Sequence, residues 1–256
     1  MSRLLLISNS TLYGGGYLDH AEAEIRDFVG DRVHVLFIPY ALHDRRGYST
    51  QAEGRFHQMG LELTSAHDLS NASRAIEQSE IIFVGGGNTF RLLHELQQKQ
   101  LIEPIRRAVR AGTPYLGSSA GSIVACPSLK TTKDMPIIQP LSFEALSLVP
   151  FQISPHYLDP DPTSTHMGET QEQRILQFLE ENDELVVGLR EGSILRVEND
   201  ALMLKGPHSA RIFCRGMEPV EVSCGSNLHE LLVRWSSVAG LVARIPATSC
   251  SSRLAM

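Results

Sequence analysis

Short apolar runs alternate with amphipathic segments over the first part of this 256-residue chain, and this alternation constrains the fold more than any other feature. Each run is rich in Val, Ile, Leu and Phe and ends in small or turn-forming residues, as buried strands do. The predicted strands are residues 3–9, 33–41, 81–87 and 114–119, and the predicted helices are residues 20–29, 51–59, 72–78, 89–99 and 101–111. Strands that alternate with helices form right-handed βαβ crossovers. We therefore predict an α/β fold with a mostly parallel central sheet and helices on both faces.

The pattern changes after residue 119. A loop, a strand at residues 151–155 and a helix at residues 170–181 are followed by short β runs joined by turns, which begin at residue 185. These runs predict a small antiparallel β section toward the C-terminus, at one edge of the sheet. Residues 1–225 are expected to form a single α/β domain. Residues 226–256 are expected to form a C-terminal extension that is partly irregular or disordered.

Composition excludes several classes of partner. The net charge of −6 disfavours nucleic acid, because proteins that bind phosphate backbones usually carry a basic surplus. No apolar run is long enough to span a bilayer, and the first ten residues are too short and polar for a signal peptide. Four cysteines at no metal-type spacing favour reduced thiols in a cytoplasmic protein. We expect a monomer or homodimer with no nucleic-acid or membrane partner.

The segment YLGSSAGSIVA, residues 115–125, contains the pattern G-x-S-x-G with Ser119 at its centre. An apolar strand precedes the pattern and a helix-compatible run follows it, which is the context that a nucleophilic serine on a tight turn requires. The glycines allow the turn, and the start of the helix supplies backbone N–H groups. The N–H of Ala120 is the expected donor to an oxyanion. Small residues alone also fit a packing loop, so the strand–turn–helix context carries the prediction.

A second turn, VGGGNTF at residues 84–90, also lies between a predicted strand and a predicted helix. Consecutive glycines permit close approach of the backbone to a ligand, so Gly87 could present its N–H as a second oxyanion donor. Phosphate binding is less favoured, because the segment lacks the G-x-G-x-x-G spacing and the Lys-Ser/Thr of a P-loop. A plain turn capped by Asn88 or Thr89 is the alternative interpretation.

A serine nucleophile needs a base, and the base needs an orienting acid. Of the ten histidines, His156 follows a predicted strand directly and so lies at the sheet edge expected for Ser119. Two acids are candidates: Asp134, in a loop between Ser119 and His156, and Glu191, which follows the strand that starts at residue 185. Either could accept a hydrogen bond from the second ring nitrogen of the histidine. Periodicity does not choose between them.

Several motifs together resemble one family. SNSTL, GGGNTF, SAG, TT-x-DMPI, ISPHY and GET-x-EQRI occur in that order between about residues 3 and 220, and the chain is similar to the peptidase E, or α-aspartyl dipeptidase, family of serine peptidases. The resemblance implies a cytoplasmic enzyme that cleaves dipeptides with an N-terminal aspartate, without metal or other cofactor. It also implies a fold akin to the class I glutamine amidotransferases. Ser119 would be the nucleophile, His156 the base, and Gly87 with Ala120 the oxyanion donors.

The resemblance leaves the acid and the specificity residue open. The family's acid has been assigned in two ways that match Asp134 and Glu191; Asp134 is preferred here, and it could also bind the substrate's free amine. An aspartyl side chain calls for a cation, preferably a guanidinium. Bacterial members read GETREQRI, with an arginine where this chain has Gln171, whereas Arg174 is retained. Asn88, Gln171 and Arg174 are therefore the predicted substrate contacts.

Three functions compete. The leading hypothesis is a serine dipeptidase that acts on small aspartyl dipeptides through an acyl-enzyme on Ser119. A cyanophycinase-like hydrolase of β-aspartyl peptides would share the S-A-G and GGGN motifs. A catalytically silent homologue could instead bind a small acidic peptide or metabolite. The joint presence of Ser119, His156 and two candidate acids favours an enzyme.

Overall fold

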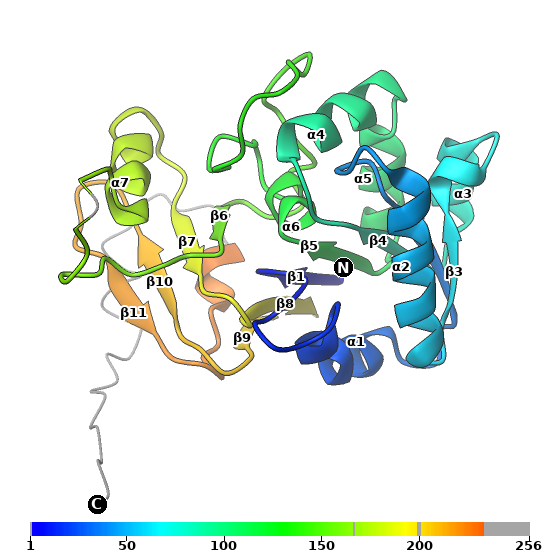
Figure 1. Ribbon diagram of the computed structural model, residues 1–256, viewed down its shortest axis with the longest axis horizontal. Coiled ribbons are helices and arrows are strands. Elements are labelled where there is room, and N and C mark those ends of the chain that lie inside the picture. The colour runs from blue at the N-terminus through cyan, green and yellow to red at the C-terminus, as the bar shows by residue number, and fades with distance from the viewer. Residues whose placement is uncertain (1, 166, 199–200, 233–256) are drawn as a thin grey trace, which may run out of the picture.

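A seven-stranded sheet forms the centre of the computed structural model, which describes residues 2–165, 167–198 and 201–232 (Figure 1). In spatial order its strands are β3 (Glu62–Ser65), β2 (His34–Ile38), β4 (Ile81–Val84), β5 (Tyr115–Ser118), β1 (Leu4–Ile7), β8 (Ile194–Glu198) and β9 (Ala201–Lys205). The strands from β3 to β1 run parallel, and β8 and β9 continue the sheet antiparallel beside β1. The predicted α/β class with a mostly parallel sheet is confirmed.

Helices cover both faces of this sheet. On one face lie α1 (Glu22–Val29) and α2 (Arg45–Gln58), and on the other lie α3 (Ala72–Gln78), α4 (Thr89–Gln98), α5 (Ile102–Arg110) and α6 (Ala120–Val124). Successive strand residues point to opposite faces, so Leu4 and Leu6 join one core while Leu5 and Ile7 join the other. Burial on both faces explains why these strands are apolar throughout.

The start of one helix and the whole of one strand lie in polar parts of the sequence, where the apolar pattern predicted neither. Helix α2 starts at Arg45 rather than near residue 51, because the Asp44 side chain caps it by accepting from the N–H of Gly47. Strand β3 is a short edge strand with a partly exposed pattern, and it carries no apolar run to predict it from. Caps and edge strands depend on local polar contacts, which hydrophobic periodicity does not report.

The β runs of the C-terminal part divide between two sheets. Strands β8 and β9 extend the large sheet, whereas β6 (Gln152–Pro155), β7 (Val186–Leu189), β10 (Ala210–Phe213) and β11 (Val220–Val222) form a second sheet, at the left of Figure 1. Its order is β11-β10-β7-β6, and β6 pairs with β7 in parallel. The single antiparallel section predicted at one edge of the sheet is thus split, because short strands carry no mark of the sheet that they join.

The second sheet is buried on both faces. Val187 of β7 contributes to the core shared with the large sheet. The opposite face of the second sheet packs under α7 (Gln171–Glu181), where Val186 and Phe213 contact Ile175 and Leu179. The second sheet is therefore wedged between the large sheet and α7, and it is held by apolar contacts on each side.

The described chain ends in a short 3-10 helix, His229–Leu232. Leu228 and Leu231 are buried in the main core, and the N–H of Leu228 donates to the carbonyl of Leu202 at 2.6 Å. The predicted extension, residues 226–256, thus begins as packed chain, and its residues 233–256 lie outside the described residues. The division at residue 225 stays a prediction. Within the described ranges, no helix has the length and apolar character needed to cross a bilayer.

Candidate active site

Ser119 occupies the turn between β5 and α6 in a backbone conformation that few non-glycine residues adopt. Its φ is 51° and its ψ is −108°, and such strained positions persist only where the surrounding structure enforces them. Two glycines make the turn possible. A Cβ on Gly121 would lie 2.1 Å from the carbonyl oxygen of Val84, and a Cβ on Gly117 would lie 2.6 Å from that of Gly121. The strand–turn–helix context predicted for this segment is present.

The structure separates the three serines of this segment. Ser118 is the last residue of β5 and is fully buried. Ser122 lies in α6, and its hydroxyl donates to the carbonyls of Ile7 at 2.8 Å and Gly117 at 2.9 Å. Ser119 is partly exposed, and its Oγ lies 3.0 Å from Nε2 of His156. The hydroxyl of Ser119 is therefore the one that faces a base.

His156 links Ser119 to Glu191. Its Nδ1 lies 2.6 Å from Oε1 of Glu191. His156 directly follows β6 and Glu191 lies two residues after β7, and these strands are parallel with Pro155 opposite Leu189. Because the segments after β6 and β7 leave the sheet at the same edge, the imidazole of His156 and the carboxylate of Glu191 meet. A histidine held this way can accept the proton of the serine hydroxyl while the carboxylate orients its other nitrogen.

Asp134 lies elsewhere. Its Oδ2 accepts from the backbone N–H and from the hydroxyl of Thr89, each at 2.6 Å. Thr89 is the first residue of α4, so this carboxylate sits at a helix N-terminus, where unpaired N–H groups and the helix dipole favour negative charge. The preference for Asp134 as the acid that orients the histidine is corrected: the structure brings the alternative, Glu191, to His156.

Ser8 joins the two sheets at the site, and sequence reasoning missed it. This fully buried residue follows β1, its hydroxyl donates to the carbonyl of Leu189 at 2.8 Å, and it accepts from the N–H of His156 at 2.9 Å. One hydroxyl thus ties the end of β1 to the ends of β6 and β7. The signal was a pair of polar residues, Ser8 and Asn9, directly after an apolar strand.

The glycine turn after β4 lies against the serine. A Cβ on Gly86 would be 3.2 Å from the Cβ of Ser119, and Gly87 has a φ of 131°. Gly87 and Ala120, the predicted oxyanion donors, therefore belong to segments that adjoin Ser119. Asn88 is occupied structurally: its Oδ1 accepts from the N–H of Arg91 at 3.0 Å to cap α4, and its Nδ2 donates to the carbonyl of Met135 at 2.9 Å.

The other two predicted substrate contacts, Gln171 and Arg174, differ in whether their side chains are already hydrogen-bonded to the backbone. Gln171 donates to the carbonyl of His156 and accepts from the N–H of Leu158, both at 3.0 Å, so its amide holds the loop after β6. The side chain of Arg174 is half exposed, and its Nε lies 3.6 Å from Oε2 of Glu169. Both residues line a cavity of about 80 Å³, together with Lys133.

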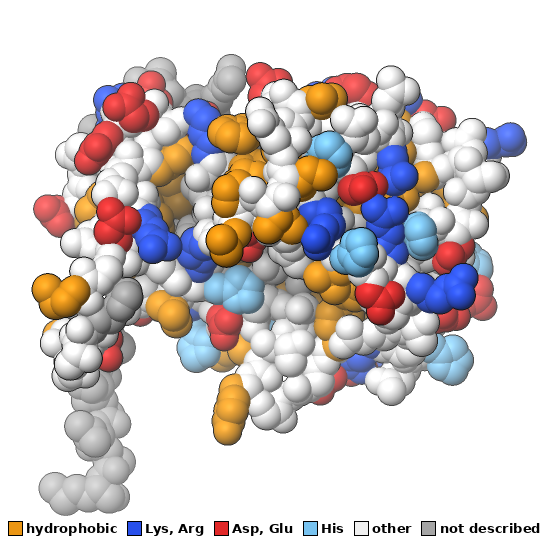
Figure 2. All heavy atoms as spheres, turned by 45° about the horizontal axis from the view of Figure 1, so that its top comes forward, with side chains coloured by type: hydrophobic (Ala, Val, Ile, Leu, Met, Phe, Trp, Pro, Cys, Tyr) orange, Lys and Arg blue, Asp and Glu red, His pale blue; other side chains and the backbone are white. Residues whose placement is uncertain are grey.

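Apolar side chains surround the site at the surface. The loop after α6 exposes Met135, Ile137, Leu141 and Phe143. Figure 2 brings the upper edge of Figure 1 forward and shows apolar side chains gathered on this face, with cationic and histidine side chains among them. No group of three or more His, Cys, Asp or Glu is placed to hold a metal ion in the described part of the chain.

A serine, a histidine and a carboxylate in hydrogen-bonded series at the carboxyl ends of strands are the arrangement of a serine-type hydrolase. The chain belongs to the family described as Peptidase family S51, whose pattern matches residues 4–205. It is 51% identical over 229 residues to a Peptidase E of Streptomyces coelicolor, covering 90% of this chain and 94% of that protein. It is 45% identical over 213 residues to a protein of Drosophila melanogaster named Probable alpha-aspartyl dipeptidase, covering 82% and 89%.

A solved structure shares the fold. The crystal structure of a peptidase from an acI-B1 Actinobacterium matches with a TM-score of 0.68 and covers 89% of this chain and 96% of that chain. The sequence identity is 16%, so this likeness concerns the fold alone. It agrees with the α/β architecture that the strand and helix pattern predicted.

Proposed function

We propose that this protein is a serine dipeptidase that hydrolyses dipeptides with an N-terminal aspartate. The observation that carries the proposal is the hydrogen-bonded series from Ser119 through His156 to Glu191. Membership of family S51 supports the reaction class, and the relatives named Peptidase E and Probable alpha-aspartyl dipeptidase support the choice of substrate.

The geometry supports acyl transfer through the serine. Ser119 Oγ attacks the carbonyl carbon of the aspartyl residue while His156 Nε2 accepts the hydroxyl proton, and the negative oxygen receives hydrogen bonds from the N–H groups of Gly87 and Ala120. His156 then passes the proton to the leaving amine, which breaks the peptide bond. Water, deprotonated by the same nitrogen, releases aspartate from the acyl-enzyme. Glu191 holds the histidine in the tautomer that both steps need.

Two finer assignments stay predictions. Asp134 anchors its loop to α4 through Thr89, and a contact with the substrate's amine would add to that role. A cytoplasmic location is supported by the free thiols of Cys126, Cys214 and Cys224.

Replacing the proposed nucleophile tests the function. Ser119→Ala should lower kcat for Asp-Leu by about 10⁴-fold or more, as the loss of a nucleophile does in serine hydrolases. Ser118→Ala is the matched control: this neighbouring hydroxyl is buried and has no hydrogen-bond partner among the described residues, so its loss should change kcat by less than about 3-fold. Circular dichroism and thermal unfolding would check that both variants fold. Wild-type rates in Ser119→Ala would refute the assignment.

A substrate panel separates the competing functions. Wild-type enzyme would be tested on Asp-Leu, Glu-Leu, Asn-Leu and Ala-Leu, and on β-linked Asp-Arg. Preference for Asp-Leu supports the proposal, whereas faster cleavage of β-Asp-Arg would favour the β-aspartyl hydrolase. A serine-directed phosphonate probe that failed to label the wild-type protein would favour a silent binding homologue.

A further inference from the structure

A cavity lies directly beside His156. Its volume is about 80 Å³, and Lys133, Ser154, Gln171 and Arg174 are among the residues that line it. One water needs roughly 10–15 Å³ on this scale, so the cavity has room for a small acidic side chain. Lys133 Nζ and Gln171 Nε2 both donate to the carbonyl of His156, at 3.0 Å each. Two residues of the cavity lining therefore contact the backbone carbonyl of His156.

Lys133 brings an uncompensated positive charge to this cavity. Its Nζ donates to the carbonyls of Pro155 at 2.8 Å and His156 at 3.0 Å, and these acceptors are neutral. Among residues 2–165, 167–198 and 201–232, no carboxylate lies within 4.0 Å of this nitrogen, although Asp134 and Glu191 act on it from farther away. Two of the three ammonium protons are thus used, which leaves one for an incoming acceptor.

Partial desolvation makes this ammonium a receptor for an anion, while the rest of the lysine side chain reaches the surface. Desolvation lowers the pKa of Lys133 to about 8, against the opposing effect of Asp134 and Glu191. A partly buried charge without a direct counterion costs free energy, and a ligand carboxylate placed beside it recovers that cost through a charge-assisted hydrogen bond. A neutral ligand of the same shape leaves the cost in place.

The other cations that line the cavity already have side-chain partners. Lys130 Nζ donates to Oδ1 of Asn182 at 2.8 Å in an exposed contact. The Arg174 side chain is 54% exposed and lies 3.6 Å from Glu169. Exposed pairs of this kind contribute little to binding because solvent screens them.

We propose that Lys133 binds the side-chain carboxylate of the substrate's N-terminal aspartate in this cavity, and so determines the preference of the enzyme for aspartate. The inference rests on the proposed function and assigns the residue that reads the substrate. Gln171, another predicted substrate contact, instead holds the loop after β6. The cation thus comes from the loop between α6 and β6 rather than from α7.

Binding to an inactive enzyme gives the cleanest test. In a Ser119→Ala background, the Kd for Asp-Leu and for its neutral isostere Asn-Leu would be measured by calorimetry. Adding Lys133→Met should weaken Asp-Leu binding by about 30-fold or more and change Asn-Leu binding by less than about 3-fold, because loss of a charge-assisted contact affects only the anion. Lys205→Met is the matched control, because it removes a lysine outside the cavity lining, and it should change both constants by less than about 3-fold.

A second variant and a pH series cover a folding defect in Lys133→Met. Lys133→Arg keeps the charge and should retain the preference for Asp-Leu over Asn-Leu. In the wild type, the ratio of kcat/KM for Asp-Leu to that for Asn-Leu should fall as pH rises through about 8, because the ammonium loses its proton there. The ratio cancels every effect that is common to both substrates; the charged side chains that act on the lysine are Asp134, Glu191 and Arg174. In Lys133→Arg the ratio should stay flat over this range.

The outcomes separate two failures. Equal weakening of Asp-Leu and Asn-Leu by Lys133→Met would mean that the lysine only holds the His156 loop, and it would overturn the assignment. An unchanged Asp preference would overturn it too. If the wild-type enzyme hydrolyses no member of the panel and Ser119→Ala binds neither dipeptide, the proposed function itself fails, and the assignment fails with it.

Discussion

The two sheets of this protein contribute different parts of the site. The large sheet presents Ser119, in the turn after β5, and the small sheet presents His156 after β6 and Glu191 after β7. The proposed nucleophile and its proposed base are thus carried by separate sheets that meet at one edge. The difference teaches that the catalytic geometry depends on how the sheets are joined, as well as on the turns that carry each residue.

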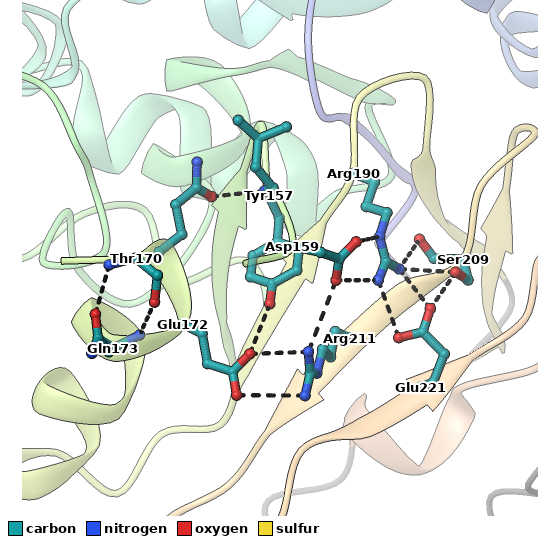
Figure 3. Close-up of polar contacts among 11 residues, drawn as sticks. Tyr157, Asp159, Thr170, Glu172, Gln173, Arg190, Ser209, Arg211 and Glu221 are labelled. Atoms are coloured by element: carbon teal, nitrogen blue, oxygen red, sulfur yellow. Dashed lines mark hydrogen bonds and ion pairs between the residues drawn. The ribbon is translucent and has the colours of Figure 1, made fainter. Parts of the chain in front are cut away.

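Both sheets are held by apolar contacts, but the small sheet also carries a charged network. Strands β1, β4 and β5 are buried and held by apolar cores on both faces. At the outer side of the small sheet, Arg190 binds Asp159 through two hydrogen bonds of 2.9 and 2.8 Å and also binds Glu221 at 2.6 Å, while Arg211 binds Glu172 at 2.9 Å (Figure 3). Because Asp159 follows His156 closely and Arg190 precedes Glu191, this network fastens the two loops that carry the base and the acid.

The largest expected effect comes from the acid of the small sheet. Glu191→Gln should lower kcat by about 10³–10⁴-fold, because an amide cannot hold and stabilise the protonated histidine. Asp134→Asn is the matched variant on the large-sheet side. It should lower kcat by less than about 10-fold while weakening the contact with α4, since a charged cap is worth about 1 kcal/mol. Steady-state kinetics on Asp-Leu would decide, and the reverse ranking would restore Asp134 as the acid.

The link between the sheets should have an intermediate effect. Ser8→Ala removes the acceptor of the N–H of His156, whereas the carbonyl of Leu189 still accepts from the N–H of Tyr157 at 3.1 Å, so the free energy of unfolding should fall by about 1–3 kcal/mol. Because His156 loses its anchor, kcat should fall while KM changes little. Denaturant unfolding and kinetics on the same preparation would test this. A variant that lost stability but kept wild-type kcat would show that the hydroxyl joins the sheets without positioning the histidine.

The smallest expected effect concerns the charged network. The hydrogen bonds from Arg190, followed by the nearby positive charges, lower the pKa of Asp159. A carboxylate whose pKa is lower when folded stabilises the protein above its unfolded pKa, near 3.9, and this stabilisation is lost as pH falls through the folded pKa. Asp159→Asn should therefore lower stability at pH 7 by less than about 1 kcal/mol, given solvent screening. The difference in Tm from wild type should shrink below about pH 4; a constant difference would exclude the ionised carboxylate as its cause.

Much of the site could be predicted from single segments. Ser119 and His156 each stand directly after an apolar strand, and G-x-S-x-G specifies a turn that only its central residue can occupy as an exposed nucleophile. Asn88 and Gln171 were predicted as substrate contacts, yet their amides are bonded to the backbone. The sequence does not distinguish a polar side chain that faces the ligand from one that is hydrogen-bonded to the protein.

The sequence by itself determined the α/β class and predicted that Ser119 and His156 act together, because strand periodicity and turn chemistry act over a few neighbouring residues. Only the tertiary structure decided that Glu191 rather than Asp134 meets His156. That choice depends on β6 pairing with β7 in a sheet of their own, and pairing between distant strands leaves no local mark. The same holds for Lys133, whose hydrogen bonds to two neutral carbonyls form when its loop packs against the end of β6.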